Sequence, residues 1–460
     1  MPLQKNQVLT LRVERLSSDG SGVAHSPDGE TVFIPGAAPG DEARVRIVKD
    51  CKRYAFGILD EVLTPSPDRI PVDCAVAGPC GGCSLRHLDY AAELRAKQEN
   101  VADAFARIGG LDVPVLPIVG SPEVNRYRNK VQFPVGVDKS GKPCIGFYAG
   151  RTHRIVPCPD CRLQPGVLNE IGNALCAFFA EKGIQPYSEE TGRGLVRHIF
   201  LRRGAHSGQI MVCLVCTRAK LPSAEELCTR LKAQFAEITT ILLNVNAKNT
   251  NVILGTETHT LYGQGYIEDT LCGVPVQLGP LSFYQVNTLA AEQLYGIAAQ
   301  YAQLTPDDLL LDLYCGMGTI GLSMAAHCRE LIGVEIVPEA IESAKANAAR
   351  MGADVAAKSR FFCADAGQAA TRLAAEGLHP DIVMLDPPRK GCDEATLSAV
   401  VRMSPRRVVY VSCNPATAAR DAAWLEQNGY HAEKVQPVDL FPRTRHCEAV
   451  LLLTKLNVER

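Results

Sequence analysis

The last third of the chain, from about residue 284 onward, alternates short apolar runs with longer amphipathic segments. Residues 309–315 (LLLDLYC) and 407–413 (RVVYVSC) are typical of buried strands, and residues 338–351 (PEAIESAKANAARM) are typical of a helix. Strands that alternate with helices at this spacing form a doubly wound, largely parallel sheet of the α/β class. Ligands of such a sheet bind at the carboxyl ends of its strands, so we expect a functional site at that edge.

A glycine-rich turn follows the first of these strands. Gly316, Gly318 and Gly321 satisfy the pattern G-x-G-x-x-G at the start of a helix. Glu335 lies 19 residues beyond Gly316, at the end of the next strand, where its carboxylate could bind a ribose diol. NAD and S-adenosylmethionine both fit this arrangement. Asp312 favours the second, because a carboxylate in the turn would attract a cationic amino-acid group and repel a pyrophosphate.

Three further strand ends carry residues suited to chemistry. Asp386 opens the motif DPPR, in which Arg389 occupies a position that is usually aromatic in methyltransferases acting on exocyclic nitrogens. Cys413 follows a strand at the expected start of a helix, where the helix dipole would lower its thiol pKa. Glu448 starts the last strand and is a candidate general base. The alternative for each is a side chain that only packs in the core or faces water.

Residues 1–63 form a separate module, because three prolines between residues 64 and 71 interrupt any helix or central strand. About five short runs of alternating apolar and polar residues, separated by Gly and Pro, predict a small β-barrel. The arrangement GSGVAHSPDGETVFIPGAAPGDEARVRI resembles the TRAM domain, an OB-like barrel of RNA-modifying enzymes. We therefore expect an RNA-binding barrel, with a generic all-β module as the alternative.

Residues 64–280 are expected to form an α+β domain with a helix at residues 91–109, and we expect this helix to pack on the C-terminal α/β domain. The chain has a net charge of −2, so any surface for nucleic acid must be local. Two basic stretches, 126–154 and 192–204, are candidates, and a solvated strand face is the alternative. The predicted phosphate contacts are Arg126, Arg128, Lys130, Arg197, Arg202 and Arg203, and the predicted stacking residues are Tyr127, Phe133, Phe147 and Tyr148.

Five motifs lie in the C-terminal part: FYQVN (283–287), DLYCGMGTIG (312–321), DPPRKG (386–391), SCNP (412–415) and RHCE (445–448). Together with the TRAM-like start and the basic middle region, they closely resemble the RNA (uracil-5-)-methyltransferases. The resemblance implies a catalytic domain over residues 281–460, with Cys413 as nucleophile and Glu448 as base. It also implies an S-adenosylmethionine site lined by Gln285, Tyr314, Thr319, Glu335, Asp365 and Asp386. Thr319 and Asp365 each stand where the family pattern has asparagine.

The same family explains four of the 18 cysteines. Some of its members hold a [4Fe-4S] cluster with four thiolates, and the resemblance assigns that role to Cys74, Cys80, Cys83 and Cys161. Zinc is the chemical rival, because four thiolates also suit a tetrahedral zinc site. Cys158 competes for the fourth position, and Cys161 is preferred because the Arg-Leu-Gln-Pro that follows it fits the family. We expect the cluster to be structural.

These observations predict a cytoplasmic, monomeric enzyme that methylates carbon 5 of a uridine in structured RNA through a covalent Cys413–uracil adduct. The barrel and the cysteine quartet favour 23S rRNA over tRNA as the substrate, because tRNA enzymes of the family commonly lack both. The alternatives are a tRNA uridine-5 methyltransferase, an RNA cytosine-5 methyltransferase, a nicotinamide oxidoreductase and a non-catalytic RNA-binding protein. No apolar run approaches the roughly 18 residues needed to span a bilayer, so no membrane association is expected.

Overall fold

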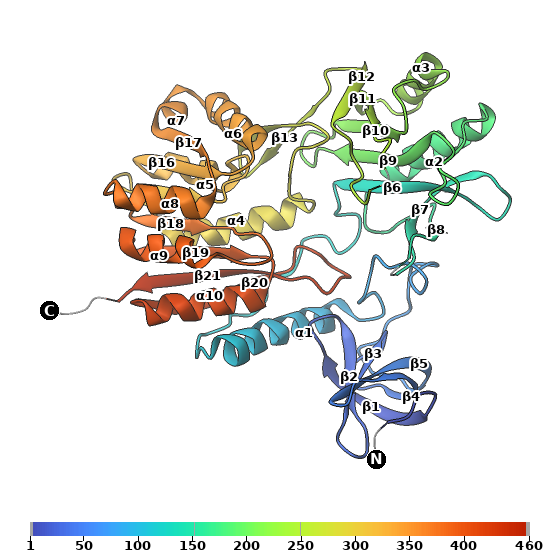
Figure 1. Ribbon diagram of the computed structural model, residues 1–460, viewed down its shortest axis with the longest axis horizontal. Helices are drawn as coiled ribbons and strands as arrows, with labels where there is room; N and C mark the ends of the chain where they lie inside the picture. The colour runs from blue at the N-terminus through green and yellow to red at the C-terminus, as the bar shows by residue number, and fades with distance from the viewer. Residues whose placement is uncertain (1–2, 151, 249, 457–460) are drawn as a thin grey trace.

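Figure 1 shows the computed structural model of the protein, which describes residues 3–150, 152–248 and 250–456. The chain forms an N-terminal barrel, a central sheet with helices on one side, and a C-terminal sheet with helices on both faces. This architecture confirms the predicted α/β class with an OB-like barrel and an α+β central part. None of the helices in the described ranges is long and apolar enough to cross a membrane.

The barrel closes from five strands in the order β1-β2-β3-β5-β4. The strands are β1 (Val8–Leu16), β2 (Ser21–His25), β3 (Thr31–Pro35), β4 (Glu42–Asp50) and β5 (Tyr54–Thr64). Alternate residues of β4 point inward, so Ala43, Val45 and Ile47 are fully buried while the residues between them face solvent. Gly57 allows β5 to approach β4, because a Cβ there would lie 2.3 Å from Val45 Cγ1.

The central sheet has the strand order β12-β11-β10-β9-β6-β7-β8. Its strands are β6 (Lys130–Val137), β7 (Pro143–Tyr148), β8 (Ile155–Pro157), β9 (Val196–Arg203), β10 (Ile210–Cys216), β11 (Ile238–Val245) and β12 (Glu257–Tyr262). Helices α2 (Gly166–Glu181) and α3 (Ala224–Gln234) pack on one face. On the other face, Phe200, Met211 and Leu242 belong to the same hydrophobic cluster as Tyr284 of the catalytic domain. The two parts therefore share a continuous apolar core. A hairpin of β13 (Ile267–Leu271) and β14 (Val274–Leu278) lies between them in the chain.

The catalytic sheet has the order β17-β16-β15-β18-β19-β21-β20. Its strands are β15 (Leu309–Leu313), β16 (Glu330–Glu335), β17 (Ser359–Cys363), β18 (Ile382–Leu385), β19 (Arg407–Ser412), β20 (Tyr430–Val438) and β21 (Glu448–Lys455). Its helices are α4 (Thr288–Ala302), α5 (Thr319–Met324), α6 (Pro338–Met351), α7 (Ala353–Lys358), α8 (Ala366–Ala375), α9 (Glu394–Met403) and α10 (Pro415–Gln427). The sequence patterns do not predict β20, whose run YHAEKVQPV interrupts its apolar residues with charged ones. Strand β21 is antiparallel to both of its neighbours.

The segment that follows the barrel packs on the catalytic domain before the chain enters the central sheet (Figure 1). It consists of α1 (Tyr90–Asp103), a π-helical turn (Ala104–Gly109) and an extended stretch. Val101 and Phe105 are buried in the same cluster as β19 and α10. Further on, Val115 and Val119 form parallel bridges with β20. This early segment is thus part of the catalytic core in space.

A buried ion network ties α1 to the loop that leads into β21. The Lys97 side chain is 2 % exposed, and its Nζ donates to Glu93 Oε1 and Asp439 Oδ1, both at 2.8 Å. Lys97 Nζ also donates to the Phe441 carbonyl at 3.2 Å. The backbone N–H of Arg443 donates to Glu93 Oε1 at 2.7 Å. The position of the loop therefore depends on α1.

Replacing Lys97 with Met should destabilise the protein, because buried Asp439 would lose its ion pair. Buried Glu93 would keep only Arg443, whose Nη1 lies 3.6 Å from Glu93 Oε2. We expect the free energy of unfolding to fall by about 3 to 5 kcal/mol. Urea unfolding can be followed by fluorescence of Trp424, the single tryptophan of the chain, which lies in α10. The control is Lys345→Met, which breaks an exposed pair with Glu342 and should cost less than about 1 kcal/mol. Equal losses in the two variants would contradict the importance of the network.

Candidate active site

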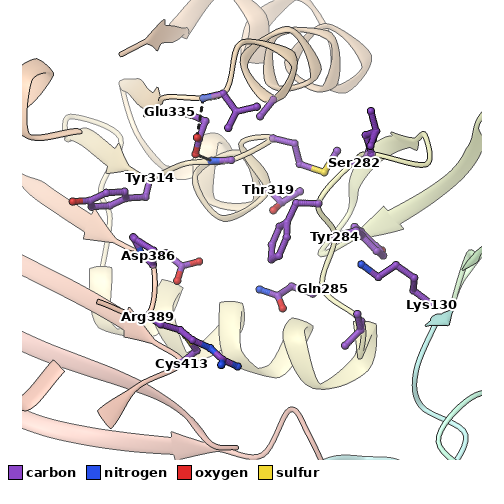
Figure 2. Close-up of a pocket in the computed structure, with 18 of the residues that line it drawn as sticks. Lys130, Ser282, Tyr284, Gln285, Tyr314, Thr319, Glu335, Asp386, Arg389 and Cys413 are labelled. Atoms are coloured by element: carbon purple, nitrogen blue, oxygen red, sulfur yellow. Dashed lines mark hydrogen bonds between the residues drawn. The ribbon is translucent and has the colours of Figure 1, made fainter. Parts of the chain in front are cut away.

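A cavity of about 1580 Å³ lies at the carboxyl ends of the catalytic strands and extends to the central sheet (Figure 2). All eight residues predicted for catalysis and cofactor binding line it: Gln285, Tyr314, Thr319, Glu335, Asp365, Asp386, Cys413 and Glu448. They come from the loop before α4, the loops after β15 to β19, and the start of β21. The fold therefore brings residues that are up to 163 positions apart in the chain, from Gln285 to Glu448, to a single cavity.

The turn between β15 and α5 presents backbone groups to the cavity. Gly316 and Gly318 have φ angles of 56° and 79°, which glycine adopts without strain. The N–H of Gly316 donates to Glu335 Oε2 at 3.2 Å. Glu335 Oε1 accepts from the backbone N–H groups of Ile336 and Val337 at 2.8 and 3.0 Å (Figure 2). These bonds fix the Glu335 carboxylate at the end of β16, beside the turn.

Asp312 lies beneath this turn and not in the cavity. It is 1 % exposed, and its Oδ2 accepts from the N–H of Gly321 at 3.0 Å. Burial raises the pKa of Asp312 to about 8. The prediction that Asp312 faces a cationic ligand group is therefore wrong, and its carboxyl instead supports the start of α5 from inside the domain.

The remaining predicted cofactor residues lie on the catalytic side of the cavity. Asp386 follows β18, and its enclosure by the cavity walls raises the pKa of Asp386 to about 7. Thr319 Oγ1 lies 3.3 Å from the hydroxyl of buried Tyr295. Asp365 caps helix α8, where its Oδ1 accepts from the N–H of Gln368 at 3.1 Å. Asp365 and Thr319 thus have structural bonds as well as positions in the cavity wall.

Cys413 is half-buried directly after β19, and Asn414 caps α10 beside it. Asn414 Nδ2 donates to the Arg389 carbonyl at 2.9 Å, which holds the DPPR loop next to Cys413. Burial, followed by the carboxylates of Glu448 and Asp386, raises the pKa of Cys413, while Arg389 opposes this rise. The sequence predicts a lowered thiol pKa at this helix start, but burial and the two nearby acids raise the pKa.

Glu448 is the first residue of β21 and is 7 % exposed. Burial is the larger cause, and Asp386 the next, of a rise in the pKa of Glu448 to about 8. The guanidinium of Arg389 acts in the opposite direction on Glu448, as it does on Cys413. Arg389 is therefore the cation that both reactive groups share. Figure 2 shows its side chain beside Cys413 in the cavity.

The FYQVN loop, which carries Gln285, is held by Asn129 at the start of the central sheet. The backbone N–H of Asn129 donates to the Val286 carbonyl at 2.8 Å. Asn129 Nδ2 donates to the Gln285 carbonyl at 2.8 Å and to Thr288 Oγ1 at 2.9 Å. Asn129 is only 5 % exposed, so these bonds are shielded from water. Sequence patterns did not single out Asn129, because an asparagine within a basic stretch carries no distinctive signal.

Arg202 forms hydrogen bonds to the segment just before this loop. It is 1 % exposed, and its Nη1 and Nη2 donate to the carbonyls of Gly279 and Ser282, both at 2.7 Å. A buried guanidinium that bonds two carbonyls is unavailable to RNA. The prediction that Arg202 contacts a phosphate is therefore wrong. Its side chain instead holds the backbone of residues 279–282 in the cavity wall.

Two other predicted phosphate contacts are also engaged within the protein. Arg126 pairs with Asp160 at 2.7 Å. Arg197 is 5 % exposed, and its Nη1 donates to the carbonyls of Asn246 and Lys248 at 3.1 and 2.6 Å. The structure thus contradicts the assignment of Arg197, because a run of basic residues in the sequence does not reveal which of them are buried. Arg126 keeps a side chain that is 31 % exposed, so it remains a predicted phosphate contact together with Arg128, Lys130 and Arg203.

The predicted stacking residues are mostly part of the core. Tyr127 and Phe133 are 5 % and 0 % exposed, so neither can stack on a base. Phe147 packs at a tilted angle on Phe133, and Tyr148 is half-buried nearby. In contrast, Phe283 is 73 % exposed and lines the large cavity. The sequence contained a signal for Phe283, because it opens the FYQVN motif.

The comparisons with known proteins agree with this site. A model of the tRNA (uracil-5-)-methyltransferase family matches residues 204–456, and a TRAM model matches residues 2–59. An uncharacterized RNA methyltransferase of Halalkalibacterium halodurans is 43 % identical over 457 residues, which are 99 % of each chain. The chain belongs to the tRNA (uracil-5-)-methyltransferase family. A second uncharacterized RNA methyltransferase, of Clostridium tetani, is 40 % identical over 454 residues, which are 99 % of this chain and 98 % of that one.

A solved structure supports the assignment of this methyltransferase to its fold. The crystal structure of Pyrococcus abyssi tRNA (uracil-54, C5)-methyltransferase, in complex with S-adenosyl-L-homocysteine, is similar with a TM-score of 0.77 and 26 % identity. The match covers 97 % of this chain and 100 % of that chain. The resemblance to the family, the methyltransferase sheet and the TRAM barrel inferred from the sequence are therefore confirmed.

Five cysteines of the methyltransferase line a second cavity, of about 270 Å³. They are Cys74, Cys80, Cys83, Cys158 and Cys161. In the described part of the chain, no three or more His, Cys, Asp or Glu side chains are grouped as ligands of one metal ion. The structure thus gathers the four predicted ligands around one space, but it shows no metal site and does not distinguish Cys161 from Cys158.

Replacing Arg389 or Glu448 with Gln should shift the reactivity of Cys413 in opposite directions. Arg389→Gln removes a cation that lowers the pKa of the thiol, so alkylation should require a higher pH. Glu448→Gln removes a carboxylate that raises that pKa, so alkylation should accelerate above about pH 8, where Glu448 is ionised in the parent protein. Mass spectrometry of the Cys413 peptide after iodoacetamide treatment measures the rate, with exposed Cys363 as the internal reference. A shift in the same direction for both variants would contradict this electrostatic description.

Proposed function

We propose that this protein transfers a methyl group from S-adenosylmethionine to carbon 5 of a specific uridine in structured RNA. The observation that carries the proposal is the position of Cys413 and Glu448 at the ends of paired strands, facing the same cavity. Ser412 pairs with Ala449 across β19 and β21, so the backbone holds the two reactive residues close together. A thiol and a carboxyl group in this arrangement suit nucleophilic activation of a pyrimidine. A nicotinamide oxidoreductase would have no use for them.

When bound, S-adenosylmethionine supplies an electrophilic methyl group. Several features of the cavity fit this cofactor. The fixed carboxylate of Glu335 suits a ribose diol, and Ile336 and Val337, which are 60 % and 45 % exposed, offer an apolar surface for adenine. Asp386 and Gln285 provide polar contacts near Cys413. The other proposed cofactor contacts are Tyr314, Thr319 and Asp365.

The proposed reaction begins with activation of the uracil ring, because carbon 5 alone is a weak nucleophile. The Cys413 thiolate adds to carbon 6, and the electron pair of the 5,6 double bond moves onto the carbon 4 carbonyl to give an enolate. Carbon 5 then forms its bond to the methyl group while the sulfur–methyl bond of the sulfonium breaks, and the electron pair of that bond stays on sulfur as a neutral thioether. Glu448 removes the remaining hydrogen of carbon 5 as a proton, and the carbon 6–sulfur bond breaks to return the thiolate. Arg389 assists because its charge favours the thiolate form of Cys413.

We propose 23S rRNA as the substrate, with tRNA as the second candidate. Support for 23S rRNA comes from the family resemblance, in which the barrel and the cysteine quartet are typical of the ribosomal enzymes. The solved relative from Pyrococcus abyssi favours tRNA, because its name gives tRNA as its substrate and it matches 97 % of this chain. Since that match extends over nearly all of the chain, the barrel does not by itself separate the two substrates.

Unmodified 23S rRNA and tRNA transcripts, incubated with the protein and methyl-labelled S-adenosylmethionine, test the proposal. We expect 5-methyluridine as the labelled nucleoside after digestion, with the larger yield from 23S rRNA. Labelled 5-methylcytidine would refute the choice of base, and labelling of the tRNA alone would refute the choice of RNA. The absence of any labelled nucleoside from both RNAs would count against the methyltransferase reaction itself.

Two variants test the assigned roles in the same assay. Cys413→Ala should lower turnover by at least about a thousandfold, because the ring would no longer be activated. Glu448→Gln should allow methyl transfer but block release, so a covalent protein–RNA adduct should persist on a denaturing gel. The matched control is Cys363→Ala, an exposed cysteine outside the cavity, which should leave turnover unchanged. Normal turnover by Cys413→Ala would remove the basis of the mechanism.

We also propose that Cys74, Cys80, Cys83 and Cys161 hold a structural [4Fe-4S] cluster. Support comes from their positions around one cavity and from Arg86, a 4 % exposed residue that lines it. Arg86 Nη1 donates to Asp73 and Asn125 at 2.7 and 3.0 Å, while its Nε and Nη2 have no hydrogen-bond partner among the described residues. A buried guanidinium with free N–H groups fits beside an anionic thiolate centre. The same donors also suit zinc.

Anaerobically purified protein should therefore be brown and contain about four iron and four sulfide per chain. Iron, sulfide and zinc analysis of the wild-type protein measures this. Cys80→Ser and Cys161→Ser should lose the colour, whereas Cys158→Ser should retain it. One equivalent of zinc in a colourless protein would refute the cluster. Loss of iron in Cys158→Ser but not in Cys161→Ser would reverse the assignment of the fourth ligand.

A further inference from the structure

Positive charge lies on the wall of the large cavity across from Cys413, where Figure 2 shows Lys130. Lys130 begins β6 and Arg128 lies two residues before it. Both are half-buried and line this cavity, and both also border the smaller cavity of the cysteines. Neither side chain has an ion pair or a hydrogen bond to any other described residue. The register of β6 with β9 pairs Lys130 with Arg202, whose guanidinium bonds only to carbonyls. Three cations therefore lie together here with no carboxylate bound to them.

This charge affects Lys130 directly. Desolvation, followed by Arg202 and Arg128, lowers the pKa of Lys130 to about 8. The acids of the cavity lie elsewhere: Figure 2 shows Glu335 and Asp386 across the cavity, with Gln285 between them and Lys130. Like charges held together in a partly desolvated place raise the free energy of the site, and a bound anion would relieve this cost. The chemistry of the wall is therefore that of an anion-binding site.

We propose that Arg128 and Lys130 form the subsite for a backbone phosphate next to the target uridine. This inference rests on the proposed function, because it identifies the anion as the RNA backbone. An arginine offers paired N–H donors to a phosphate, and a lysine adds a mobile point charge. The subsite lies in the cavity that contains Cys413, so a phosphate bound here belongs to the nucleotide that enters the cavity or to its immediate neighbour.

Asn129 connects this subsite to the loop that carries Gln285. It lies between Arg128 and Lys130 in the sequence, and it bonds the carbonyls of Gln285 and Val286. The phosphate subsite and the loop that carries Gln285 are thus attached to the same short segment. Binding of the backbone at Arg128 and Lys130 would set the position of the nucleotide relative to Gln285. The subsite would thereby orient the base as well as increase affinity.

RNA binding tests the subsite without requiring catalysis. The probes are unmodified 23S rRNA and tRNA transcripts, with Kd measured by fluorescence anisotropy over a range of salt concentrations. Lys130→Gln should raise the Kd about five- to tenfold at 0.1 M salt and lower the log–log salt slope by about 0.7 to 0.9. The matched control, Lys220→Gln, removes an exposed lysine outside the cavity and should leave both values unchanged. Values for Lys130→Gln equal to the control would overturn the proposal.

A conservative variant separates charge from structure. Lys130→Arg should retain the wild-type Kd at pH 7, whereas a loss equal to that of Lys130→Gln would overturn the proposal. Wild-type affinity should fall between pH 7 and 9 as the Lys130 amine loses its proton, and Lys130→Arg should show a smaller fall. Arg202, whose pKa burial lowers to about 10, stays largely charged over this range, and burial raises the pKa of Tyr284 above it. Asp386 and Glu448 do titrate between pH 7 and 9, but both are present in the wild type and in Lys130→Arg. The difference in pH dependence between these two proteins therefore reports the titration of Lys130.

Turnover measurements distinguish this inference from the proposed function. Lys130→Gln should raise the KM for RNA while the kcat and the Kd for S-adenosylmethionine stay within twofold of wild type. A fall in kcat with an unchanged KM would overturn the phosphate subsite and leave the methyltransferase reaction intact. A wild-type protein that binds neither RNA would overturn both proposals. The pattern of results therefore identifies which of the two has failed.

Discussion

Strand β21 runs antiparallel to β19 and β20 within an otherwise parallel sheet, so its first residue lies at the edge where the parallel strands end. A parallel strand can bring only the residues that follow it to that edge. Because β21 is reversed, its first residue, Glu448, lies at the edge instead. The adjacent Ala449 pairs with Ser412, which directly precedes Cys413. The juxtaposition of a thiol and a carboxyl group is thus a consequence of sheet topology. The other site residues are arranged around this pair.

The two walls of the cavity differ in charge. The acids Glu335, Asp365 and Asp386 lie on the catalytic side, together with Arg389, whereas the cations Arg128 and Lys130 lie at the start of the central sheet. Each group is enclosed enough that the pKa values of Asp386 and Lys130 move toward neutrality. A positively charged cofactor and a negatively charged polymer would each find the complementary wall. The loop between the walls is held by buried hydrogen bonds, which keeps the two regions at a fixed separation.

The sequence predicted the catalytic strands and the residues at their ends, because apolar runs followed by glycine, DPPR or Cys413 are local patterns with a defined place in a parallel sheet. It failed where the outcome depends on burial by distant segments. Asp312 looked like a ligand contact but lies beneath the turn, and Arg202 looked like a phosphate contact but is 1 % exposed. Strand β20 could not be predicted because its apolar residues alternate only weakly with polar ones. Tertiary packing, including the bridges from Val115 and Val119, stabilises it as a strand.

Two separate segments of the chain form the catalytic domain. The first is α1 with the extended stretch up to Val119, and the second begins at α4. In the first segment, Lys97 and Glu93 form hydrogen bonds that hold the loop before β21. The catalytic domain is therefore not a portable unit that recombination could move between proteins by a single cut near residue 281. A gene fusion that kept only the C-terminal part would lose the buried partners of Asp439 and Arg443. Insertions or exchanges of the barrel alone, which joins upstream of α1, would leave those partners in place.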